Sequence, residues 1–126
     1  MNLVLMRDRL TVCQLPPDAA LPAWAAGVTD FASITRTTEE LSIVCREGIV
    51  PAGVKQEPGW RAFKVEGPLD FSLTGILASL LDPLAKAGIS TFAVATFNTD
   101  YVLVQEAKAE AARAALQSAG HAVRRV

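Results

Sequence analysis

Two hydrophobic periods alternate along the second half of this chain, and their order restricts the fold. Apolar residues recur every three or four positions from Leu73 to Leu84, which is typical of one buried face of a helix. A second, alanine-rich helix is predicted from about Lys108 to Ala119 and ended by Gly120. Strand-like runs precede, separate and follow the helices, at residues 60–65, 91–97, 101–105 and 121–126. The resulting order, β-α-β-β-α-β, predicts an antiparallel sheet with two helices on one face.

The first half is predicted to be a shortened version of this α+β, ferredoxin-like arrangement. Strand-like runs lie at residues 3–6, 10–15, 31–35 and 41–45, and the first two are expected to form a hairpin or one bent strand. The alanine-rich segment Asp18–Gly27 is too short for more than one or two helical turns. We therefore expect two domains: a shortened N-terminal unit with a Gly- and Pro-rich connector, residues 1–59, and a C-terminal unit, residues 60–126.

An internal repeat relates the two halves. Phe31–Glu39 aligns without a gap on Phe92–Asp100, matching Phe, Ala, two Thr and an acidic residue. With one residue of slack, Ser42–Val44 then falls on Val102–Val104. The repeat predicts two related hairpins, each with an acidic residue at its turn.

The second of these hairpins carries the most informative polar residue. The tripeptide Asn98-Thr99-Asp100 lies between two strand-like runs and favours a tight turn. The carboxylate of Asp100, set beside an apolar strand, needs a partner to offset its desolvation. That partner is either the neighbouring backbone, in an Asx turn, or a ligand.

Composition excludes several classes of protein. Apolar residues make up 51% of the 126 residues and charged residues 20%, which excludes a disordered chain. The net charge of −1 provides no basic surface for nucleic acid or anionic lipid, so neither nucleic acid nor a membrane is an expected partner. No run approaches the ~20 apolar residues of a membrane span, and the N-terminus lacks a signal-peptide pattern, so we expect a cytoplasmic protein.

Neither a metal nor another cofactor is expected. Cys13 and Cys45 lie in separate apolar runs without a CxxC partner, and His121 is the only histidine. Both cysteines are expected to be reduced core residues, because a free cysteine behaves as a small hydrophobe. His121, which begins the last strand, is expected at the surface.

Several segments resemble the ACT-domain proteins related to the animal cytosolic arginine sensors. They are Val65–Phe71, Gly75–Leu77 and Thr96–Val104, and in the first half Thr37–Val44 resembles the corresponding turn and strand. The resemblance covers most of the chain and implies one tandem pair of ACT units, the first of them shortened. It also implies that an amino acid binds between the C-terminal units of a homodimer.

Carried over position by position, the resemblance implies a set of ligand contacts. These are Asp70, Phe71, Ser72, Leu73, Thr96, Phe97 and Asp100, with Ser90 and Thr91 contributed by the second copy. A turn before a helix offers free amides to a carboxylate, and Asp100 offers a negative charge to a cation, which together describe an amino acid. Asp70 is also placed to cap the helix, and Thr96 and Phe97 also fit ordinary strand positions. Because Ser72 and Leu73 are neutral where the arginine sensors carry acidic residues, arginine specificity does not transfer.

The sequence thus predicts a non-catalytic regulatory module that binds an amino acid as a homodimer. One alternative is an interaction module that docks a partner protein through a sheet edge or helix face without any ligand. Another is a small enzyme with Asp100 as general base, although no supporting acid, nucleophile elbow or phosphate-binding glycine loop accompanies it.

Overall fold

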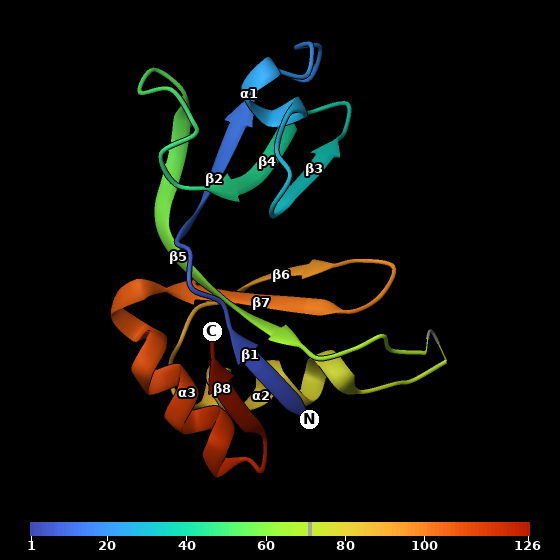
Figure 1. The fold of residues 1–126 in the computed structure, drawn as a ribbon, viewed down its shortest axis with the longest axis vertical. Coiled ribbons are helices and arrows are strands. Elements are labelled where there is room, and N and C mark those ends of the chain that lie inside the picture. The colour runs from blue at the N-terminus through green and yellow to red at the C-terminus, as the bar shows by residue number, and fades with distance from the viewer. Residues whose placement is uncertain (71) are drawn as a thin grey trace. The chain divides into compact units, whose positions relative to one another are not determined.

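The computed structural model describes residues 1–70 and 72–126. The chain forms two compact units (Figure 1). The C-terminal unit consists of Met1–Arg7 and Trp60–Val126, and the inserted unit consists of Asp8–Gly59. Within the residues described, no helix has the length and apolar composition needed to cross a membrane.

The C-terminal unit has the predicted α+β, ferredoxin-like architecture. Its elements are β1 (Asn2–Leu5), β5 (Lys55–Val65, which begins in the inserted unit), α2 (Ile76–Lys86), β6 (Phe92–Ala95), β7 (Asp100–Gln105), the 3-10 helix η1 (Glu106–Lys108), α3 (Ala109–Ser118) and β8 (Ala122–Arg125). The strands lie in the order β6-β7-β5-β1-β8, and all neighbours are antiparallel except β1 and β8. The predicted order of elements from residue 60 onward is confirmed, and β1 is an additional strand between β5 and β8.

The position of β1 corrects two expectations. Its residues Leu3 and Leu5 lie opposite Val65 and Phe63 of β5, so β1 forms no hairpin with the strand that follows it. Both leucines are buried in the core of the C-terminal unit, because this sheet offers them an apolar face. The structure therefore places Met1–Arg7 in the C-terminal unit, whereas the sequence assigned it to residues 1–59.

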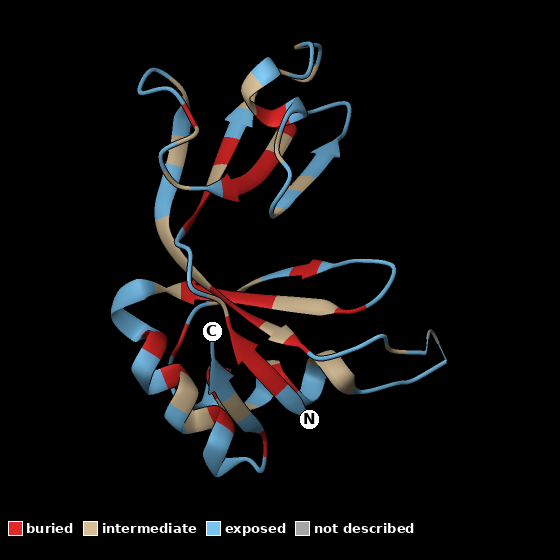
Figure 2. Cartoon of the chain, in the orientation of Figure 1, coloured by how far each residue is buried: buried red, intermediate tan, exposed pale blue. Residues whose placement is uncertain are grey.

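The two helices of the C-terminal unit cover one face of its sheet (Figures 1 and 2). Leu80 and Leu84 of α2 and Leu116 of α3 are buried against strand residues that include Phe63. The leucine spacing in the sequence thus identifies the buried face of α2 correctly. The helix nevertheless begins at Ile76, three residues after Leu73, where the apolar pattern in the sequence begins.

His121 contacts a carbonyl of α2 that Pro83 leaves without an intrahelical donor. Pro83 lies inside the helix and has no backbone N–H to donate to the carbonyl of Ser79, one turn earlier. Nε2 of His121 lies 2.9 Å from that carbonyl oxygen, and since a carbonyl only accepts, Nε2 carries the proton. His121 is 9% exposed, so its expected surface location is wrong. It supplies the donor that Pro83 lacks, and the helix continues past the proline to Lys86.

The inserted unit is a shorter arrangement of the same kind. It contains β2 (Leu10–Leu15), α1 (Ala23–Ala26), β3 (Ala32–Arg36) and β4 (Leu41–Arg46), in the strand order β3-β4-β2-β5. The β3–β4 hairpin is present as predicted, and residues 47–54 contain no helix between β4 and β5. Trp24 packs half-buried against a core that includes Cys13, Leu41 and Cys45.

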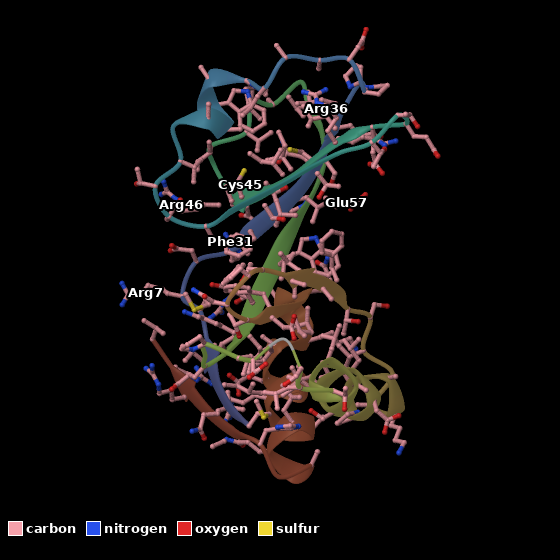
Figure 3. The ribbon with its side chains drawn as sticks, turned by 90° about the vertical axis from the view of Figure 1, so that its right-hand side faces the viewer. Arg7, Phe31, Arg36, Cys45, Arg46 and Glu57 are labelled. Carbon is pink, nitrogen blue, oxygen red and sulfur yellow. The ribbon has the colours of Figure 1, made fainter. Side chains whose placement is uncertain are left out.

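The two cysteines are free and buried, as the sequence predicts (Figure 3 labels Cys45). Burial raises the pKa of Cys45 to about 11 and also raises the pKa of Cys13. Because the thiolate is the reactive form, we expect neither cysteine to react with iodoacetamide at neutral pH until the protein is denatured, as counted by mass spectrometry. Rapid labelling of the native protein would contradict this expectation.

The same shift predicts a loss of stability in alkali. The Cys45 thiol ionises near its ordinary pKa of 9.0 in the unfolded chain and only near about 11 in the folded unit. The contribution of the buried, neutral Cys45 thiol to the free energy of unfolding is therefore complete below pH 9 and is lost as the pH rises towards 11. A Cys45→Ala variant should lose less stability than the wild type over this window in urea titrations.

Candidate functional site

A cavity of about 340 Å³ lies in the C-terminal unit between the segment that leads into α2 and the β6–β7 turn. Its lining residues are Leu69, Asp70, Leu73, Gly75, Ile76, Leu77, Ala95, Thr96, Phe97, Asn98, Thr99 and Asp100. The cavity is thus formed by the two segments that the sequence singled out.

Hydrogen bonds fix the shape of the β6–β7 turn. The turn is the four-residue loop Thr96–Thr99, in which the Thr96 amide donates to the Thr99 carbonyl at 2.8 Å. The Thr96 hydroxyl oxygen accepts a hydrogen bond from the Thr99 amide at 3.2 Å. The turn is therefore stabilised by a threonine side chain, and Asp100 is the first residue of β7 instead of a turn residue.

Two further hydrogen bonds hold this turn against the segment after β5. The buried Thr99 hydroxyl donates to the Val65 carbonyl at 2.5 Å, and the Leu69 amide donates to the Asn98 carbonyl at 2.7 Å. A Cβ atom at Gly67 would lie only 3.0 Å from the Asn98 oxygen, so this close approach favours a glycine, and a larger residue would have to displace the turn by a few tenths of an ångström. These contacts fix the β6–β7 turn, which forms one wall of the cavity, against the segment that forms the other.

The wall that leads into α2 differs from the predicted helix cap. The Asp70 carboxylate accepts a hydrogen bond from the Ser72 amide at 2.8 Å, in an Asx turn before the helix. That bond also lowers the pKa of Asp70. The N-cap of α2 is Gly75, at φ 75°, and it makes no side-chain cap bond. The first amides of α2 have no intrahelical acceptor, and within residues 1–70 and 72–126 none of them donates to a side chain. Ile76 and Leu77 line the cavity.

Asp100 contributes a carboxylate to the opposite wall. It is half-buried and pairs with Ala95 in the β6–β7 ladder. Among residues 1–70 and 72–126, its carboxylate forms no hydrogen bond and no ion pair. The Asx-turn alternative is not found, because Thr96 provides the side-chain bond of this turn.

The structure brings together most, but not all, of the residues that the resemblance implied. Those that line the cavity are Asp70, Leu73, Thr96, Phe97 and Asp100. Ser72 lies beside it and bonds Asp70, whereas Ser90 and Thr91 precede β6 and lie at its far end from Thr96. Phe71 lies outside the described residues.

Sequence reasoning missed the residues that shape the cavity. Leu69, Gly75, Asn98 and Thr99 were not predicted as site residues, although all four line it. A glycine within the first turn of the predicted helix was a usable signal for Gly75, since glycine is disfavoured inside a helix and accepted as an N-cap residue. The bond from Thr99 to Val65 joins residues 34 positions apart, and no local pattern reports it.

The internal repeat is present in the structure, in a different register. Thr37 donates its amide to the Glu40 carbonyl at 2.9 Å and accepts from the Glu40 amide at 3.2 Å, as Thr96 does with Thr99. The β3–β4 turn is therefore also a four-residue threonine turn. In this register the counterpart of Asp100 is the buried Leu41, so the predicted acidic residue at Glu39 is not equivalent to Asp100.

No part of the described structure suggests a metal centre. Within residues 1–70 and 72–126, no three His, Cys, Asp or Glu side chains lie close enough to hold a metal ion. The cavity offers two carboxylates, the first amides of α2, and both polar and apolar side chains.

Comparison with known proteins follows the same division of the chain. Residues 55–118 match the sequence model of the ACT domain, and residues 8–53 match a second model described as an N-terminal domain. Over 48 residues, 37% of this chain, it is 46% identical to the human cytosolic arginine sensor for mTORC1 subunit 1. The chain spans 15% of the length of that relative.

Solved structures resemble the chain over almost its whole length. A protein from Agrobacterium tumefaciens is 40% identical, with a TM-score of 0.92, and the match covers 99% of this chain and 92% of that one. The regulatory subunit of aspartate kinase from Thermus thermophilus is 18% identical, with a TM-score of 0.60 over 90% of this chain and 93% of that one. The second similarity shows the fold alone.

Proposed function

Because the chain belongs to the ACT-domain family, we propose that it is a non-catalytic regulatory module that binds a free amino acid in the cavity of its C-terminal unit. The human relative is named as an arginine sensor, and an aspartate kinase regulatory subunit shares the fold. Both names support a role in sensing amino acids.

The observation that carries the proposal is the half-buried Asp100 carboxylate, which has no partner among the described residues and lines the cavity. It offers a charge-assisted hydrogen bond to an ammonium group. The uncapped start of α2, at Gly75 and Ile76, faces the same cavity and offers amides to a carboxylate. An α-amino acid carries both of these groups.

The proposal includes a homodimer. Ser90 and Thr91 are separated from Thr96 by the four residues of β6, roughly 13 Å of extended chain. A single copy therefore does not bring them to the cavity, and a second copy would have to contribute them. Strand β6 pairs only with β7 among the described strands, so its outer edge is available to another chain.

A thermal-shift screen against the common amino acids tests the proposal. A ligand that binds only the folded state raises Tm by mass action, by an amount that grows with its concentration over Kd. We expect at least one amino acid to raise Tm, and light scattering to report a dimer. If no amino acid raises Tm while a partner protein binds the chain without one, the module is an interaction domain. Turnover of a metabolite that Asp100→Asn abolishes would instead indicate an enzyme.

We expect one ligand per chain, because the inserted unit closes the corresponding space. Arg36 occupies the position that matches Ala95, and its guanidinium donates to the carbonyls of Pro17 at 2.5 Å and Ala19 at 2.8 Å, across the turn before α1 (Figure 3 labels Arg36). The position of Asp100 is taken by Leu41.

Calorimetric titration measures this stoichiometry directly. It should give one site per chain, and Arg36→Ala should leave the affinity of that site unchanged. Two equivalent sites per chain would contradict the assignment of Arg36 to a closed, non-binding repeat.

A further inference from the structure

The charged residues of the cavity wall all have the same sign. Asp70 and Asp100 are its only charged residues, and no lysine, arginine or histidine lines the cavity in the described structure. Because the Ser72 amide holds the pKa of Asp70 below its ordinary value, this carboxylate stays negative at neutral pH. A second negative charge on a ligand, beyond the α-carboxylate, would therefore meet like charges and no cation.

Half of the ten uncharged lining residues are aliphatic, and the others are Gly75, Phe97 and the polar residues Thr96, Asn98 and Thr99. Leu69 and Leu73 lie on the segment before α2, and Ile76 and Leu77 form the first turn of the helix. Leu73 is 51% exposed, which leaves apolar surface that a ligand side chain can cover. These residues lie next to the uncapped amides of α2, where the proposed function puts the ligand's α-carboxylate.

From these two observations we propose that the cavity selects amino acids with an uncharged aliphatic side chain, an inference that rests on the proposed function. Asp100 binds the α-ammonium group, and the side chain packs on Leu69, Leu73 and the first turn of α2. Asp70 is already hydrogen-bonded within its own turn and acts by repelling acidic side chains.

A matched set of six-carbon amino acids separates the possible recognition modes. Norleucine, lysine and 2-aminoadipate share a carbon chain and differ in the group at its end. We expect norleucine to bind at least tenfold more tightly than 2-aminoadipate, and more tightly than lysine. If lysine binds as tightly as norleucine or more tightly, the carboxylates of the cavity recognise the ligand's side chain. If 2-aminoadipate binds more tightly than norleucine, a cation that the described lining does not contain must bind its side-chain carboxylate. Either result would overturn the aliphatic assignment and leave amino-acid binding intact.

A homologous series measures the apolar contact. From alanine through norvaline to norleucine, each added methylene that becomes buried should tighten binding by about fourfold. The Leu73→Ala variant should flatten this series, whereas Leu21→Ala, an equally conservative change of an exposed leucine in the inserted unit, should not. A series that is flat in the wild type overturns the inference. Failure of every amino acid to bind overturns the proposed function itself.

Discussion

Replacing Asp100 by Asn is expected to weaken amino-acid binding by about 10- to 100-fold, the range for losing a charged hydrogen-bond partner. The amide has nearly the same shape as the carboxylate, so the cavity between Thr96 and Leu69 should keep its geometry. What disappears is the negative charge that faces the ligand's ammonium group. Calorimetry with the amino acid that gives the largest thermal shift measures the change in Kd.

The control for this variant is Glu39→Gln. The sequence alignment placed Glu39 on Asp100, whereas the hydrogen bonds of the two turns make Leu41 its counterpart. Glu39→Gln removes the same charge from an exposed turn and should leave Kd unchanged. If Asp100→Asn binds as tightly as the wild type, the ammonium group is not held by Asp100 and the proposed orientation of the ligand is wrong.

Replacing His121 by Ala is expected to lower the free energy of unfolding by about 0.5–1.5 kcal/mol, the net contribution of one hydrogen bond, here a partly buried one to the exposed residue Ser79. The group left without a donor is the Ser79 carbonyl, because Pro83 has no N–H to offer it. A Pro83→Ala change restores that N–H within the helix. In the Pro83→Ala background, the His121→Ala change should therefore cost about 1 kcal/mol less.

The four proteins of this cycle can be compared by urea denaturation. Any contribution of His121 that does not involve Ser79, such as the contact of its Nδ1 with the Met1 amine at 3.2 Å, is common to both backgrounds and cancels. Equal costs in the two backgrounds would show that His121 stabilises the protein in some other way than by its bond to α2.

Local patterns account for the part of the fold that the sequence predicted correctly. The spacing of the leucines in α2 and of the alanines in α3 predicts which face of each helix is buried. The strands between the two helices are predicted from the remaining apolar runs. The pairing of β1 could not be predicted in this way. Leu3 lies opposite Val65 and beside Val123, and nothing near Leu3 in the sequence specifies partners so distant.

The residues proposed for the site came from two different sources. Asp100 was identified because a carboxylate beside an apolar strand needs a partner, whereas the segment at Asp70 was identified through the resemblance to the ACT-domain proteins. The matching of the two turns was in error because it compared residue types. The feature that the turns share is the hydrogen bonding of Thr37 and Thr96. When these two threonines are matched, Leu41 is the structural counterpart of Asp100.

The pairing of β1 with β5 means that one domain of this protein is interrupted by another. The Met6 amide donates to the Ala62 carbonyl at 2.8 Å, so the chain leaves the C-terminal unit and re-enters it at neighbouring points. Residues 8–59 thus occupy the place of a hairpin loop. Loop-closure entropy rises only slowly with loop length, so evolution could enlarge this loop into a folded unit at little cost to its host. During synthesis, β1 emerges well before β8, so the sheet that contains both strands can be completed only after the inserted unit and both helices have been made.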